Sequence, residues 1–166
     1  QILFSVGQCC RVTWVVLNGT RFHYVDWGGD GPVLVCLHGA GGNAHHWDTL
    51  AQTLQGELRI IALDQRGHGN TDDPPLGHMI TEMANDIEHF VEALSLSNFN
   101  LLGHSMGARI SLVYAGQHSE KIHKLVLSDP PHYPVEDDIP GEIEHYGQRP
   151  NSFASKTEAL EYLRKD

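Results

Sequence analysis

Basic residues, cysteines and long apolar runs are all scarce in this chain of 166 residues. Lysine and arginine number 11 against 21 aspartates and glutamates, so the formal net charge is −10 with histidine neutral. Nucleic acids and anionic membrane surfaces bind clustered basic side chains, and we therefore expect neither a nucleic acid nor a membrane as a partner. No apolar run approaches the roughly 20 residues that span a bilayer.

The three cysteines, Cys9, Cys10 and Cys36, are odd in number and lack the spacing of a zinc site. We predict reduced thiols, no metal and a cytoplasmic location. The chain begins with Gln1, and the apolar run over 2–6 lacks the length and the basic flank of a signal peptide. A hydrophobic fraction of 40% is enough for a folded core, and the length suits one domain.

An antiparallel hairpin is predicted near the start of the chain. Residues 12–17 and 22–26 are rich in β-branched and aromatic side chains, and they flank Asn18-Gly19, a pair that tolerates the positive φ angles of a tight turn. Short, continuous apolar runs follow. Such runs are typical of strands buried on both faces, and they occupy residues 33–37, 58–63, 99–102 and 124–127.

Helical patterns alternate with these strands. Apolar residues recur at spacings of three and four from Trp47 to Leu54 and from Ile80 to Leu94, and a third helix is predicted from Met106 to Gln117. Alternation of strand and helix predicts an α/β fold. We expect a mostly parallel, doubly wound sheet with helices on both faces and the antiparallel hairpin at its N-terminal end.

Prolines and acidic residues change the character of the sequence after residue 130. We expect residues 1–135 to form the core with six strands, and residues 136–166 to form a connection and the start of a cap or lid. Ser155 and Glu158 have the spacing of a capping box, which predicts a short final helix.

The strongest chemical signal is Gly103-His104-Ser105-Met106-Gly107, a Gly-x-Ser-x-Gly motif between a predicted strand and a predicted helix. A serine on so tight a turn adopts a strained backbone conformation that exposes its hydroxyl, and the two flanking positions admit only a very small residue. The following helix directs N–H groups at the point where negative charge develops when Ser105 attacks a carbonyl. We predict that Ser105 is a nucleophile and that the Met106 N–H is one arm of an oxyanion hole.

The second arm is expected in the glycine-rich segment 38–42, which directly follows the strand over 33–37. Glycines allow a backbone N–H to face the substrate oxygen, and the N–H of Ala40 is the best placed.

The same segment has an alternative interpretation as a dinucleotide-binding site. Gly39-x-Gly41-x-x-Ala44 matches that fingerprint, and Asp64 follows about 20 residues later. This interpretation leaves Ser105 without a role. It also places His45-His46-Trp47 where a helix must pack closely on the sheet.

Three motifs, in this order and spacing, resemble the α/β-hydrolase superfamily, in particular its epoxide-hydrolase-like, haloperoxidase-like and carbon–carbon-hydrolase-like branch. They are His38-Gly39-Ala40-Gly41-Gly42, Asp64-Gln65-Arg66-Gly67-His68-Gly69 and the segment from Gly103 to Gly107. The resemblance covers about residues 12–129. It implies a nucleophile at Ser105, an oxyanion hole formed by the N–H groups of Ala40 and Met106, and no cofactor.

The type of nucleophile narrows the chemistry that the resemblance implies. Epoxide hydrolases and haloalkane dehalogenases use an aspartate, so Ser105 favours an esterase, a perhydrolase or a carbon–carbon hydrolase. We expect an acyl-enzyme formed on Ser105 from a small molecule with an ester-like or otherwise activated carbonyl. The alternative is a non-catalytic protein that keeps the pocket for a small hydrophobic ligand.

A nucleophilic serine needs a histidine base and a carboxylate that holds the tautomer of that histidine. In this family both usually follow later strands, so we expect the chain to be a C-terminally truncated piece with little activity of its own. Asp129 is a candidate acid, although a turn before Pro130 explains it more simply. His132 and His145 are candidate bases, although a solvated surface position explains each of them more simply.

The remaining histidines are expected to have structural roles. His38, His68 and His104 should order loops around the site through hydrogen bonds. Adjacent residues point in different directions, so His45 and His46 make a poor pair of metal ligands.

Overall fold

The computed structural model describes residues 11–54, 56–130 and 154–163. They belong to two compact units, Gln1–His132 and Tyr133–Asp166. In the second unit, helix α5 (Lys156–Leu163) begins with the predicted cap, because Ser155 Oγ accepts a hydrogen bond from the Glu158 N–H at 3.2 Å. The assignment of residues 136–166 to a connection and cap stays a prediction.

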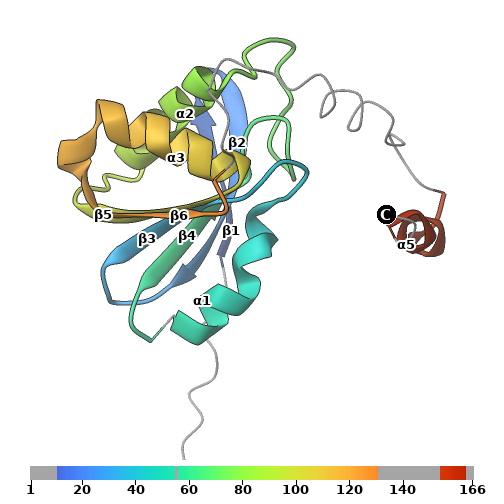
Figure 1. Cartoon of the computed structure of the whole chain (residues 1–166), viewed down its shortest axis with the longest axis horizontal. Helices are drawn as coiled ribbons and strands as arrows, with labels where there is room; N and C mark the ends of the chain where they lie inside the picture. Colours follow the sequence, from blue (N-terminus) through green and yellow to red (C-terminus); the bar gives the residue numbers. More distant parts are fainter. Residues whose placement is uncertain (1–10, 55, 131–153, 164–166) are drawn as a thin grey trace, which may run out of the picture. The chain divides into compact units, whose positions relative to one another are not determined.

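The first unit contains a sheet of six described strands in the order β1-β2-β4-β3-β5-β6 (Figure 1). Strands β1 (Arg11–Leu17) and β2 (Thr20–Gly28) form the predicted antiparallel hairpin. Asn18 and Gly19 have φ angles of 49° and 82°, as a tight hairpin turn requires. Strand β2 then pairs antiparallel with β4 (Arg59–Leu63), and this pairing joins the hairpin to the rest of the sheet.

The other strands confirm the mostly parallel sheet. Strand β3 (Val33–Leu37) pairs parallel with β4 on one side and with β5 (Phe99–His104) on the other, and β5 pairs parallel with β6 (Ile122–Ser128). The order of the strands therefore reverses at β3, because β4 is added on one side of β3 and β5 on the other. In open α/β sheets, ligands bind at the carboxyl ends of the strands beside such a point.

Helices cover both faces of the sheet, as predicted. Helices α2 (Ile80–Ala93) and α3 (Met106–Gln117) lie on one face, and α1 (Asp48–Leu54) lies on the other (Figure 1). The helix expected from Trp47 begins differently, because residues Ala44–Trp47 form a 3₁₀ turn, η1, before α1 starts.

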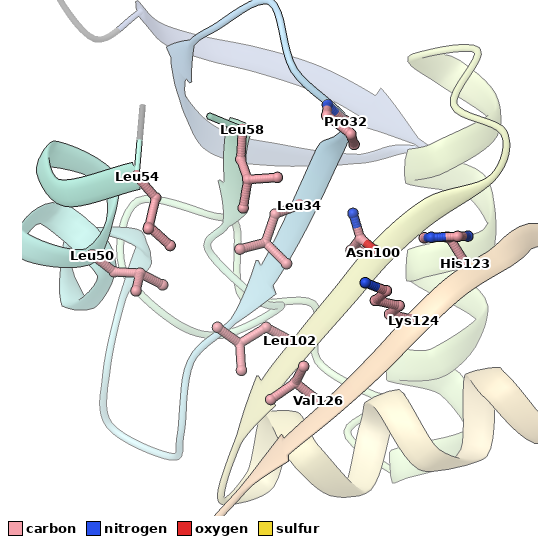
Figure 2. A pocket seen from close by; sticks show the side chains of 10 residues that line it. All are labelled: Pro32, Leu34, Leu50, Leu54, Leu58, Asn100, Leu102, His123, Lys124 and Val126. Atoms are coloured by element: carbon pink, nitrogen blue, oxygen red, sulfur yellow. The ribbon is translucent and has the colours of Figure 1, made fainter. Parts of the chain in front are cut away.

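Strand β6 departs from the prediction that every apolar run would be buried on both faces. Its side chains alternate in exposure, and Val126 is 50% exposed. In the part of the chain that the structure describes, β6 has β5 as its one neighbour. Beside it, an apolar groove of about 390 Å³ runs between α1 and β6, with Leu34, Leu54 and Leu102 along it and Lys124 at its edge (Figure 2).

Candidate active site

Ser105 lies on the turn between β5 and α3 with φ 51° and ψ −115°, a backbone conformation that residues with a side chain rarely adopt. Its N–H donates to the Ser128 carbonyl at 3.0 Å, and its own carbonyl accepts from the N–H groups of Ala108 and Arg109. Hydrogen bonds to β6 and to the first turn of α3 therefore hold the strained conformation. The turn has the geometry predicted from the motif, and the catalytic role of Ser105 stays a prediction.

The two glycines of the motif let three elements approach one another. A Cβ on Gly103 would collide with the Gly107 carbonyl, and a Cβ on Gly107 would collide with the Leu37 carbonyl and lie 2.7 Å from the His38 carbonyl oxygen. Those are backbone atoms, which cannot rotate away as a side chain can. Helix α3 therefore begins close against the end of β3, and Ser105 lies beside the loop that follows β3.

Replacing Gly107 by alanine should destabilise the protein by about 3 kcal/mol or more, because the added methyl group must displace β3 or α3. Gly116→Ala is the matched control, since Gly116 lies on the same helix and a Cβ there has nothing within 4 Å. That substitution should stabilise by about 0.5 kcal/mol through helix propensity. Urea unfolding followed by circular dichroism measures both effects, and a Gly107→Ala protein of wild-type stability would contradict the close approach.

The segment after β3 packs directly against the serine. A Cβ on Gly39 would lie 3.2 Å from Ser105 Cβ. The Gly42 N–H donates to the Gly39 carbonyl at 3.1 Å, and Gly41 has a φ of 70°, so residues 39–42 form a tight turn. Among the described residues, nothing accepts a hydrogen bond from the Ala40 N–H or the Met106 N–H. Both N–H groups near Ser105 are therefore available to a ligand.

His38 ties this turn to the loop that follows β4. Its buried ring accepts a hydrogen bond at Nε2 from the Gln65 N–H at 3.1 Å, and its Nδ1 lies 2.8 Å from the Gly39 carbonyl oxygen. A ring that accepts at one nitrogen and donates at the other is neutral. Burial lowers the pKa of His38 to about 4, which agrees with a neutral ring.

The lowered pKa of His38 predicts a loss of stability in mild acid. In the unfolded chain this histidine titrates near its ordinary pKa of 6.5, so the unfolded state binds more protons between pH 6.5 and pH 4. The free energy of unfolding should fall by about 3 kcal/mol over that interval on account of His38. Urea unfolding at both pH values should show a smaller fall in His38→Gln, and an equal fall in both proteins would contradict the prediction.

Asp64 occupies the same edge of the sheet, but its carboxylate is already engaged. It accepts hydrogen bonds from the Ala44 N–H at 2.5 Å and the Asn70 N–H at 2.8 Å, and it lies 2.8 Å from Nδ1 of the buried His23. A dinucleotide site needs this carboxylate to bind a ribose hydroxyl. The geometry therefore argues against the dinucleotide interpretation.

The histidines beside the site differ in how they are held. His68 orders its loop as predicted, with Nδ1 2.9 Å from the Arg66 carbonyl oxygen. His104 does not make the expected hydrogen bond, because its buried Nδ1 has no partner in the described part of the chain. Its ring instead stacks on His46, with centroids 5.1 Å apart and planes at 13°. Nothing in the sequence pattern indicated this contact between residues 58 positions apart.

His45 and His46 point in different directions, as predicted for adjacent residues. His45 Nδ1 lies 3.0 Å from Asp48 Oδ1, whereas His46 faces His104. Within residues 11–54, 56–130 and 154–163, no three His, Cys, Asp or Glu side chains are grouped to bind a metal ion. Over the same ranges, no helix combines the length and apolar character needed to cross a membrane.

Asp129 follows β6 at the edge where Ser105 lies. Strands β5 and β6 pair with His104 opposite Ser128, so the residue after each of these is next to the same turn. Asp129 is exposed and has a φ of 49°, a left-handed conformation that aspartate and asparagine adopt more readily than most residues other than glycine. Its position next to the Ser105 turn distinguishes it from an ordinary surface aspartate.

The candidate bases His132 and His145 remain predictions. His132 and His145 lie outside the described residues. Within the described ranges, no histidine forms a hydrogen bond with the Ser105 hydroxyl.

The sheet order and the strained serine turn together define an α/β-hydrolase. A family model for the alpha/beta hydrolase fold matches residues 32–161, and the chain belongs to that family. This confirms the superfamily and the fold class predicted from the three motifs.

The similar curated proteins include hydrolases of several kinds. The chain is 39% identical over 118 residues to N-formylmaleamate deformylase of Pseudomonas putida, a match that covers 70% of this chain and 44% of the deformylase. It is 33% identical over 131 residues to human epoxide hydrolase 4, which covers 77% of this chain and 36% of that protein. The chain thus spans less than half the length of these relatives.

Solved structures agree with these relationships. The crystal structure of N-formylmaleamic acid deformylase from Pseudomonas putida S16 has a TM-score of 0.67 at 30% identity and covers 73% of this chain and 47% of its own. Cfl2 from Burkholderia cenocepacia has a TM-score of 0.73 at 25% identity, with 94% and 55% covered.

Proposed function

We propose that the chain supplies the nucleophile and the oxyanion hole of a serine hydrolase that cleaves an ester or a short N-acyl amide through an acyl-enzyme. One observation carries the proposal: Ser105 lies on a strained turn beside two N–H groups, of Ala40 and Met106, that have no acceptor among the described residues. Amide cleavage is favoured by the names of two relatives, N-formylmaleamate deformylase and 2-(acetamidomethylene)succinate hydrolase.

The proposed reaction begins when Ser105 Oγ attacks the substrate carbonyl and its proton passes to a histidine base. The carbonyl oxygen becomes an oxyanion, which accepts hydrogen bonds from the Ala40 and Met106 N–H groups. Preorganised donors of this kind contribute about 10²- to 10³-fold each to kcat. The protonated histidine then gives this proton to the leaving alcohol or amine, and its expulsion leaves an ester on Ser105. Water, deprotonated by the same base, attacks the ester and releases the carboxylic acid and the Ser105 hydroxyl.

Asp129 is proposed as the carboxylate that orients the base. Its place beside the Ser105 turn, at the end of the neighbouring strand β6, supports this role. If Asp129 is only a turn residue, replacing its carboxylate by an amide should leave turnover unchanged.

Covalent labelling tests the proposal. The protein, together with any sequence that adjoins it in its gene, is incubated with a fluorophosphonate, and the labelled peptide is identified by mass spectrometry. We expect one adduct, on Ser105. An adduct elsewhere, or none, would contradict the proposal. A small hydrophobic ligand that raises the melting temperature without being turned over would favour the non-catalytic alternative.

A further inference from the structure

We propose that the stacked rings of His46 and His104 position the two arms of the oxyanion hole relative to each other, an inference that rests on the proposed function. One arm, Ala40, lies on the turn after β3, and the other, Met106, lies at the start of α3. His46 follows the first arm by six positions, and His104 directly precedes Ser105. The stack is therefore a side-chain contact between the two segments that carry the arms.

Packing contacts on one edge and one face hold the His104 ring. Its Nδ1 is buried without a hydrogen-bond partner among the described residues, so no hydrogen bond at that atom orients the ring. One edge of the ring lies against the turn after β3, because a Cβ on Gly39 would be 2.9 Å from Nδ1 and 3.3 Å from Cε1. One face lies against His46. A movement of His46 would therefore be transmitted through His104 to Gly39, which directly precedes Ala40.

His46 is itself held by the core, although its side chain is exposed. Its ring meets the buried Trp47 edge to face, with centroids 4.9 Å apart and planes at 76°. The backbone of this segment is also held. The His46 backbone N–H donates to the Asn43 carbonyl at 3.0 Å, and the Ala44 backbone N–H donates to the Asp64 carboxylate. A ring fixed in this way can hold His104 in place, which a freely rotating surface side chain could not do.

Loss of the His46 ring is expected to lower kcat and to leave KM nearly unchanged. Loss of the His46 ring leaves the His104 ring without support on one face, so the Ala40 N–H shifts relative to the Met106 N–H. Misplacement of a catalytic group by about 1 Å costs on the order of 10²-fold in rate. Because negative charge on the oxygen develops only as the reaction proceeds, the loss falls on kcat and leaves KM nearly unchanged.

The experiment compares three variants of the protein, with any sequence that adjoins it in its gene, using p-nitrophenyl acetate as substrate. His46→Ala should lower kcat by about 10-fold or more with little change in KM. His46→Phe keeps a flat ring and should retain kcat to within about threefold of the wild type. His45→Ala is the matched control, because His45 is the adjacent exposed histidine and pairs with Asp48 instead of packing on the site; it should leave kcat unchanged.

Each outcome has a distinct meaning. Wild-type kcat in His46→Ala would overturn the positioning role while leaving the serine mechanism intact. An equal loss in His46→Ala and His46→Phe, with lowered melting temperatures in both, would reduce His46 to a general structural residue and also overturn the proposal. Turnover that survives Ser105→Ala would overturn the proposed function itself. The rate of fluorophosphonate labelling provides a second readout and should fall in parallel with kcat in His46→Ala.

Discussion

Ser105→Ala should reduce the turnover of p-nitrophenyl acetate by at least about 10⁴-fold, because the acyl-enzyme cannot form without the hydroxyl. The substitution should not impair folding, since alanine has the same backbone preferences and the Ser105 N–H and carbonyl keep their hydrogen bonds. Initial rates and thermal melts of the same preparations separate the two effects. Ser128→Ala is the matched control, because the Ser128 carbonyl still accepts from the Ser105 N–H after its hydroxyl is removed.

Ser105→Gly adds a test that concerns strain instead of chemistry. A φ of 51° with ψ −115° is easy for glycine and costly for serine, so this variant should be inactive and more stable than the wild type by about 1 kcal/mol. Substantial turnover in Ser105→Ala would exclude the acyl-enzyme mechanism. A destabilised Ser105→Gly would show that the turn is not strained.

Asp129→Asn should lower kcat by about 10³- to 10⁴-fold while changing KM little, because an amide can neither stabilise the imidazolium that forms nor hold the histidine in the required tautomer. Asparagine is also the residue that best replaces aspartate at a positive φ. The turn after β6 should therefore survive, and the melting temperature should stay within about 2 °C of the wild type.

This pairing of effects separates the two interpretations of Asp129. If the residue only forms a turn, Asn preserves both turnover and stability, and that result would remove Asp129 from the proposed mechanism. Asp30→Asn is the control for loss of one negative charge, because Asp30 is an exposed aspartate in the connection between β2 and β3. Its kinetic constants should match those of the wild type.

Most of the fold could be predicted because local patterns determine it. The period of apolar residues and the Gly-x-Ser-x-Gly motif located α3 at its observed bounds, Met106–Gln117, and Asn18-Gly19 located the hairpin turn. Exposure along β6 could not be predicted in this way. An apolar strand is buried on both faces only if other elements cover both faces. The sequence of the strand itself does not predict which elements will cover it.

The candidate site likewise has features that the sequence predicted and contacts that it could not predict. The crowding around Gly103 and Gly107 follows from the turn itself, so the motif indicated it. The stack of His46 on His104 depends on how the loop after β3 packs against the end of β5. The spacing of the two residues in the sequence does not predict that contact. For Asp129 the sequence left two interpretations open. Its positive φ fits a turn residue, and its position beside the Ser105 turn fits the functional interpretation.

The exposed side of β6 has a consequence for the handling of concentrated solutions. Among the described residues, β6 pairs with a strand on one side only and lies beside an apolar groove. Such an edge is a template for association between copies, and a charge such as that of Lys124 opposes it. The net charge of −10 also keeps copies apart, but salt screens that repulsion beyond about 10 Å at 0.1 M ionic strength. Dilution and low salt therefore keep copies of this chain apart.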